Sequence, residues 1–230
     1  MRWAGLPPDA FTVVMATGIV AVAARDVGWA AVSTVLTGLA GTVLGVLAVL
    51  VLVGLVVTGR AVGPGPDPLT GVLALFSVVA ACDVLAAAVG DRPIAVTVVL
   101  GLVAALCWVV LVPRTLAVLR SRWAADEVGG ASGARGAWLL GAVATESLAL
   151  TAARLARAGV APRLLLTVAV TCWVLGVVVY VVTAVPVVGR LRATRARPDV
   201  LTPDTWVLMG GLAIATLSGI LTDPQFRMVV

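Results

Sequence analysis

The chain has 230 residues, of which 61% are hydrophobic and only 12% are charged. A soluble domain has about 45–50% apolar and about 25% charged residues and could not bury such an excess of apolar surface, so the composition predicts an all-α, integral membrane protein. All 16 basic residues are arginine and histidine is absent, which excludes imidazole metal sites, histidine proton relays and the Ser-His pair of an intramembrane protease.

Seven apolar segments approach the length of about 20 residues that a helix needs to cross a bilayer. They cover residues 8–24, 33–57, 69–89, 94–119, 136–153, 162–188 and 203–221, within a single transmembrane domain over residues 1–230. The first is interpreted as a membrane helix and not as a signal peptide, because no small-residue cleavage site precedes a polar mature domain. Only a few residues separate the third and fourth segments, which predicts a tight antiparallel hairpin.

The arginines lie mainly in the short connectors between these segments, together with most glycines and prolines. Alternate assignment of the connectors puts ten arginines on the side of the N-terminus and six on the other side. The positive-inside rule then predicts a plasma-membrane protein with a cytoplasmic N-terminus and an external C-terminus. Nucleic acid is not an expected partner, because the net charge of +5 is spread over connectors and does not form one basic patch.

A Pro-Asp pair stands at or close to the start of three odd-numbered segments, in "PPDAF", "PDPL" and "TPDTW". Proline loses no hydrogen bond in a first helical turn, and aspartate accepts hydrogen bonds from the free N–H groups there, so these pairs predict helix starts on one side of the membrane. The odd-numbered segments are also richer in small and hydroxylated residues than the even-numbered ones. This alternation predicts repeated hairpins with one helix facing an interior and the other facing lipid. The alternative is that Pro-Asp recurs by chance and the small residues serve packing alone.

Three stretches resemble the tellurite-resistance/C4-dicarboxylate transporter (TDT) family, which includes bacterial permeases and the plant guard-cell slow anion channels. They are "FTVVMATGIVAVAA" at 11–24, "WLLGAVATESLAL" at 138–150 and "PDTWVLMGGLAIATLSG" at 203–219. The resemblance implies an architecture of ten helices in five hairpins around a central pore, with the odd-numbered helices inside. It also implies that this chain is truncated after the seventh helix and lacks the ninth, which carries a pore-plugging phenylalanine in characterised relatives.

Two acidic residues lie inside the expected membrane helices, Asp83 in the third and Glu146 in the fifth. An acidic side chain at the centre of a membrane helix costs about 2.5–3.5 kcal/mol on insertion scales, so each is interpreted as a functional group or as a structural hydrogen-bonding partner of another helix. Further candidate pore-lining positions share small or hydroxylated side chains, which suit weakly selective anion passage, with helix packing as the alternative. These are Thr17, Gly18, Thr145, Ser147, Gly210, Gly211, Thr216 and Ser218.

Together these features predict a permease or channel for small anions or C4-dicarboxylates, passive or proton-linked, with no enzymatic activity, no metal and no cofactor. Tellurite resistance is part of the family's name, and no particular residue of this sequence indicates it. The alternative is a non-conducting, truncated homologue that acts as a membrane interaction subunit. A homo-oligomer that completes the ring of hairpins would make transport possible again.

Overall fold

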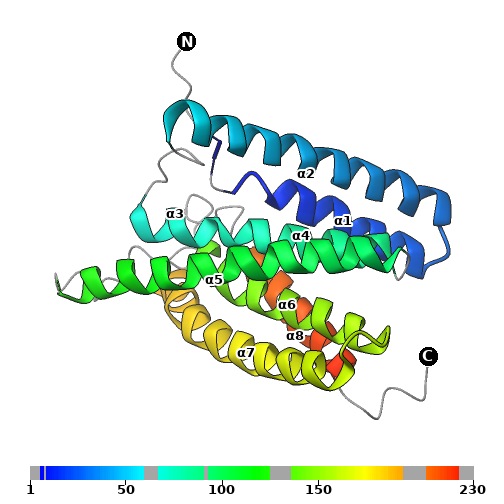
Figure 1. Ribbon diagram of the computed structural model, residues 1–230. Coiled ribbons are helices and arrows are strands. Elements are labelled where there is room, and N and C mark those ends of the chain that lie inside the picture. The colour runs from blue at the N-terminus through cyan, green and yellow to red at the C-terminus, as the bar shows by residue number, and fades with distance from the viewer. Residues whose placement is uncertain are drawn as a thin grey trace.

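The computed structural model describes residues 6–7, 9–59, 67–90, 93–124, 136–193 and 206–222, and every regular element in these ranges is helical (Figure 1). The elements are α1 (Thr12–Asp26), α2 (Ala30–Thr58), α3 (Pro68–Ala74), α4 (Phe76–Val89), α5 (Ile94–Ala124), the 3-10 helix η3 (Gly136–Leu139), α6 (Leu140–Arg157), α7 (Pro162–Ala193) and α8 (Val207–Thr222). The prediction of an all-α polytopic membrane protein is confirmed.

Five segments are long and apolar enough to cross a membrane: Ala30–Val57, Pro68–Val89, Ile94–Arg122, Gly136–Arg157 and Pro162–Ala193. They correspond to the second to sixth expected segments. The first and seventh expected segments form helices as well, but α1 has 15 residues and α8 has 16, fewer than the about 20 that a full crossing takes.

The helices form an inner row and an outer layer. In the span formed by α3 and α4, 78% of the most apolar stretch is buried inside the protein, and in the span formed by η3 and α6 the share is 89%. In α2, α5 and α7 the corresponding share is only 17%. Along the inner row α1 packs on α4, α4 on α6 and α6 on α8, while α2, α5 and α7 cover α1, α4 and α6 from outside. Helices that follow each other in the chain therefore pair as hairpins with one inner and one outer member, as the alternating composition predicts.

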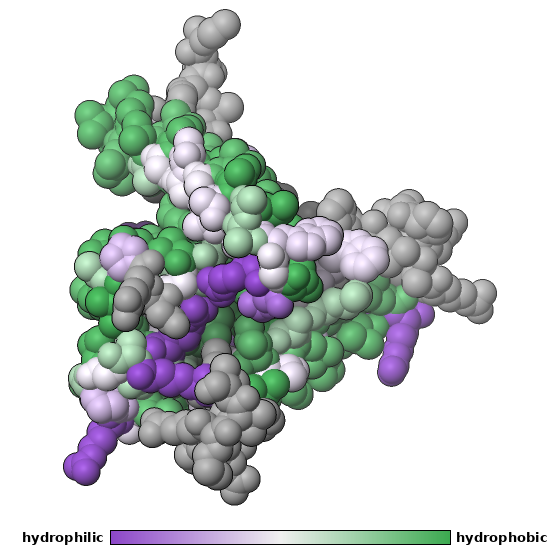
Figure 2. All heavy atoms as spheres, turned by 90° about the vertical axis from the view of Figure 1, so that its right-hand side faces the viewer, coloured by the Kyte–Doolittle hydropathy of each residue, from purple (hydrophilic) through white to green (hydrophobic). Residues whose placement is uncertain are grey.

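The outer surface suits a lipid environment. Large apolar side chains on the outer helices are exposed, among them Val56 at 86%, Leu102 at 65% and Val182 at 66%. Figure 2 looks onto the end of the molecule at which α1, α4 and α6 finish, and shows hydrophilic residues in a band across the middle of that end. We call this end of the bundle the Gly90 end, after the residue that follows α4.

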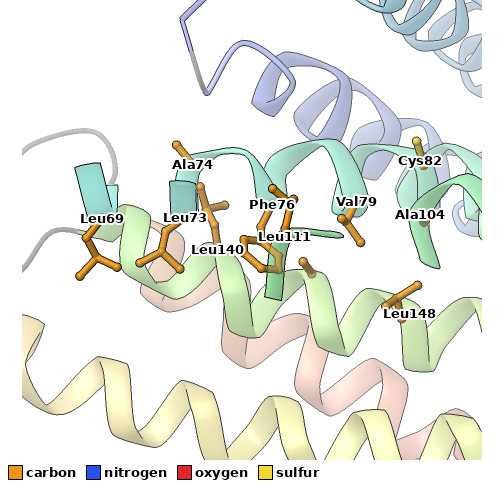
Figure 3. Close-up of a cluster of buried hydrophobic side chains, with 11 residues drawn as sticks. Leu69, Leu73, Ala74, Phe76, Val79, Cys82, Ala104, Leu111, Leu140 and Leu148 are labelled. Atoms are coloured by element: carbon orange, nitrogen blue, oxygen red, sulfur yellow. The ribbon is translucent and has the colours of Figure 1, made fainter. Parts of the chain in front are cut away.

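The largest buried apolar cluster joins the inner row to α5 (Figure 3). Leu73 of α3 and Phe76 of α4 belong to it, together with Leu111 of α5 and with Leu140 and Leu148 of α6. In a bilayer, where lipid tails are as apolar as these side chains, such a cluster stabilises the helix pairs through close van der Waals packing. The cluster fixes α6 against α4, which positions the polar residues described below.

The start of α3 follows the prediction and the start of α1 does not. Asp67 is the N-cap of α3, with its Oδ2 accepting hydrogen bonds of 2.9 Å from the backbone N–H and the hydroxyl of Thr70, and Pro68 is the first helical residue. The prediction that the first Pro-Asp pair caps its helix is wrong, because the N-cap of α1 is Phe11 and has no side-chain hydrogen bond. Asp9 lies in a preceding turn, where its backbone carbonyl accepts from the N–H of Thr12 at 3.0 Å. The third pair, at 203–204, lies outside the described residues.

The third expected segment is interrupted at Leu75. There the N–H of Leu75 donates to the carbonyl of Val72 at 3.2 Å, and the N–H of Val78 donates to the carbonyl of Leu75 at 3.0 Å. Both bonds connect residues three apart, so the chain tightens for one turn as in a 3-10 helix. The result is two helices, α3 and α4, where the apolar run predicts one.

Asp67 also pairs with Arg122 of α5, whose Nη2 donates to Asp67 Oδ1. Burial alone raises the pKa of the Asp67 carboxyl, but the hydrogen bonds from Thr70 and the charge of Arg122 outweigh it and hold the pKa below its ordinary value. The folded state therefore favours the carboxylate. This contribution to stability is present above the unfolded pKa of about 3.9 and is lost as the pH falls through the lowered folded pKa.

We expect Asp67→Ala to lower the free energy of unfolding by about 1–2 kcal/mol, because it removes both the helix cap and the ion pair. Asp67→Asn should lower the free energy of unfolding by less, since asparagine also caps helices. Thermal unfolding in detergent at neutral pH measures both effects. Asp9→Ala is the matched control, because Asp9 caps no helix with its side chain, and equal losses for Asp9→Ala and Asp67→Ala would contradict this role.

Candidate functional site

The carboxyl of Asp83 lies in the interface between α4 and α6 and is 0% exposed. Its Oδ2 is 2.9 Å from the Oγ of Ser147, which is also 2.9 Å from the backbone carbonyl of Ala144. The hydroxyl carries a single proton, so it serves one of these acceptors at a time. Within the described residues Asp83 Oδ1 has no hydrogen-bond partner. Such a buried, incompletely bonded carboxyl is rare in proteins.

Glu146 lies in a second interface, between α6 and α7. It is also 0% exposed, and neither carboxyl oxygen has a hydrogen-bond partner among the described residues. The backbone of α7 passes close by at Gly176, where a Cβ atom would be 2.5 Å from the Glu146 Cγ and 3.2 Å from its backbone nitrogen. Glycine is what permits this approach. Helix α7 thus closes over the acidic side chain.

Thr145 faces a third helix. The indole Nε1 of Trp108 on α5 donates to the Thr145 Oγ1 at 2.9 Å, and the hydroxyl donates in turn to the carbonyl of Gly141 at 2.8 Å. Successive residues of an α-helix point about 100° apart, so three consecutive side chains of α6 reach three different neighbours. Thr145 contacts α5, Glu146 contacts α7 and Ser147 contacts α4. The structure therefore brings Ser147 and Asp83 together and directs Glu146 away from them.

The candidate positions on α1 and α8 divide into packed and accessible residues. A Cβ on Gly18 would be 2.7 Å from the Val84 Cγ1, and one on Gly211 would be 2.6 Å from the Tyr180 ring, so both glycines lie where helices approach closely. Gly210 and Thr216 are exposed, and Thr17 is half-buried. The hydroxyls of Thr17 and Thr216 donate to carbonyls of their own helices at 2.9 and 2.8 Å, as the buried Ser218 does at 2.7 Å.

A cavity of about 370 Å³ lies between α5, α6 and α7. Its lining is almost entirely apolar and includes Leu102, Leu148 and Val168, with Thr151 and Cys172 as the more polar members. An anion would lose its hydration there without gaining hydrogen-bond donors. This cavity therefore does not suit a path for anions.

Sequence reasoning missed the grouping of two arginines at the Gly90 end. Arg25, in the last turn of α1, donates from its Nη1 to the carbonyls of Ala87 and Ala88 at 3.1 and 3.2 Å. Arg154, in the last turn of α6, donates from its Nη1 to the same Ala87 carbonyl at 3.2 Å. Arginines in last turns were visible in the sequence and suit the negative end of a helix dipole. The sequence gives no sign that both act on a third helix.

Comparison with known protein families finds a match. The model for SLAC1, described as a voltage-dependent anion channel, matches residues 5–229. No curated protein and no solved structure matches the chain. The matched region includes all the helices described above, and the family is the one that the three sequence stretches resemble. The chain therefore belongs to the SLAC1 family of voltage-dependent anion channels.

Proposed function

We propose that the chain is a permease or channel that moves small anions or C4-dicarboxylates across the plasma membrane, passively or together with protons. The observation that carries this proposal is the family match over residues 5–229. The largely buried helices α4 and α6, surrounded by helices with an apolar outer surface, support it. The proposal treats residues 1–230 as one transmembrane domain.

A proton link is supported by the two carboxyls of the inner row. Asp83 and Glu146 are both fully buried, and both carry oxygens without a hydrogen-bond partner among the described residues. Ionisable groups inside membrane proteins commonly mark ion or proton pathways. We assign them as proton-binding groups beside the anion path, since a carboxylate repels an anion. The other proposed lining positions are Thr17, Gly18, Thr145, Ser147, Gly210, Gly211 and Thr216.

Flux in liposomes tests the transport proposal. The full chain reconstituted into liposomes should accelerate the uptake of nitrate or succinate above that of protein-free liposomes. A matched preparation containing an unrelated helical membrane protein controls for leaks caused by insertion. If neither anion enters faster than in the controls, the chain does not transport these anions on its own, and the non-conducting interaction subunit becomes the better description.

Orientation and association are further parts of this proposal. The excess of arginine on the side of the N-terminus supports a cytoplasmic N-terminus, which cysteine labelling from one side of the membrane checks. The inner row ends in α1 on one side and in α8 on the other, and both helices expose large apolar residues such as Val20 and Leu212. These edges support association of copies. Crosslinking in membranes that yields only 23.2 kDa monomers would contradict it.

A further inference from the structure

The apolar cavity between α5, α6 and α7 is a groove that follows α6. Buried residues of α6, among them Leu148 and Leu155, form its floor. Leu102 and Val109 of α5 line one wall, and Val168 of α7 lines the other. All three of these wall residues are exposed, so the groove opens on the outer surface that suits lipid. In Figure 1, α6 lies between the two outer helices that pack on it.

The groove reaches from one end of the bundle to its middle. At one end it includes Val160, in the connector between α6 and α7. At the other end it includes Val109 and Leu148, which lie near the centres of their membrane-crossing spans. Along α5 the lining runs from Val98 to Val109, which is about 16 Å of helix. Half of a hydrocarbon core is about 15 Å thick, so the groove has the depth of one leaflet.

The connector end of the groove lies at the level of the lipid headgroups. Arg157 is the last residue of α6 and Arg163 is the second residue of α7, and both are exposed. Arginine side chains near the ends of membrane helices extend to the polar interface. A phospholipid with one chain in the groove therefore has its phosphate at the depth of this connector and the end of that chain at the middle of the membrane.

The lining of the groove suits a hydrocarbon chain. Of its lining residues, Trp108, Thr151 and Cys172 are the ones with nitrogen, oxygen or sulfur in the side chain. The indole Nε1 of Trp108 already donates to Thr145. A polar group that entered would lose its hydration with little return. A hydrocarbon chain instead gains van der Waals contacts with three helices, contacts that the lining would forgo around an empty gap.

The size of the groove excludes a whole helix from a second copy of the chain. A stretch of helix 16 Å long and about 10 Å in diameter occupies about 1,200 Å³. The groove has about 370 Å³, so a helix could enter it with only part of its surface. A single extended chain is narrow enough to lie inside.

We propose that the groove between α5 and α7 binds one acyl chain of a membrane phospholipid, from the leaflet at the Gly90 end. The chain covers the part of α6 that the two outer helices leave open. It packs against the ring of Trp108, which holds the Thr145 hydroxyl. This site goes beyond the proposed function and does not depend on it, so phospholipid binding without anion flux would support the site.

Native mass spectrometry of the full chain tests the proposal. The protein is reconstituted into vesicles of dioleoylphosphatidylglycerol and then extracted in a mild detergent, and the phospholipid retained by each chain is measured. We expect the wild type to retain one phospholipid. Ala105→Phe places a ring in the groove and should lower the retained fraction about tenfold, because the ring and the chain compete for one space. Val168→Phe, on the opposite wall, should act in the same way.

Ala117→Phe is the matched control, since it makes the same substitution on an exposed residue of α5 beyond the groove. It should retain the phospholipid as the wild type does. A wild type without phospholipid would overturn the site, as would equal retention in Ala105→Phe and Ala117→Phe. A wild-type dimer without phospholipid would assign the groove to a second copy and would overturn the proposal as well.

Photolabelling locates the chain without any substitution in the protein. The probe is phosphatidylglycerol with a diazirine in the middle of one acyl chain, mixed into the same vesicles. Labels should concentrate on residues 98–109 and 165–172 and should be several times rarer on α2. Helix α2 is the internal control, because its span is buried to the same small extent as those of α5 and α7. Equal labelling of the three helices would show ordinary contact with bulk lipid and would overturn the site.

Discussion

Glu146→Gln is expected to remove most of the pH dependence of anion flux while leaving the protein folded. Glutamine has the shape of a protonated glutamate and stays neutral at every pH. In the wild type, protonation of Glu146 removes a negative charge from the inner row, so anion flux should rise as the pH falls. The variant should show the flux of the low-pH wild type throughout.

The expected size follows from Coulomb's law. A unit charge about 10 Å from the permeating anion, at an effective dielectric constant of about 20, is worth about 1.7 kcal/mol. This corresponds to a change of about tenfold or somewhat more between the neutral and charged forms. Because Glu146 makes no hydrogen bond among the described residues, its replacement by glutamine breaks none of the contacts seen there.

Nitrate is the permeant of choice for this measurement, because it does not titrate across the pH range in which liposomes are stable. Flux is recorded from about pH 5 to pH 8 for the wild type, for Glu146→Gln and for Asp83→Asn. Asp83 serves as the comparison, because its carboxyl is as fully buried as that of Glu146 but lies on the other side of α6. An unchanged pH profile in Glu146→Gln contradicts its proton role. A profile that flattens only in Asp83→Asn transfers that role to the α4–α6 interface.

The helices could be predicted because their main signal is local. A run of about 20 apolar residues between charged connectors is visible without any tertiary contact, and all seven expected segments are helical over most of their length. Boundaries and breaks are less local. No proline or glycine stands at Leu75, where α3 and α4 separate, whereas Pro113 and Pro186 lie inside uninterrupted helices.

The candidate site could be predicted only in part, for a related reason. Asp83 and Glu146 stood out because acids are costly within membrane helices. The sequence offers Thr145, Glu146 and Ser147 side by side as candidate functional residues. Adjacent residues of a helix diverge in direction, and the neighbour that each one meets depends on how the other helices pack. The hydrogen bond between Ser147 and Asp83 joins residues 64 positions apart, so no local sequence pattern predicts it.

Gly176→Ala is expected to lower the free energy of unfolding by about 1–3 kcal/mol, the usual range for inserting a group into a packed interior. The added methyl would be 2.5 Å from the Glu146 Cγ and 3.2 Å from the Glu146 backbone nitrogen. The side-chain atom can turn aside at some cost in rotamer energy. The backbone atom belongs to α6 and can yield only if the two helices separate, which weakens their packing along its length.

Gly189→Ala tests this reasoning within the same helix. Nothing lies within 4 Å of a Cβ at Gly189, and alanine is favoured over glycine in a helix by about 1 kcal/mol. Its expected effect is therefore a small gain in stability, opposite in sign to that of Gly176→Ala. Thermal unfolding of both variants in the same detergent makes the comparison. Shifts of the same sign and size would show that α7 does not pack on α6 at Gly176. The opposite signs would show that α7 packs directly against α6 beside the buried carboxyl of Glu146, where the glycine permits the close approach of the two helices.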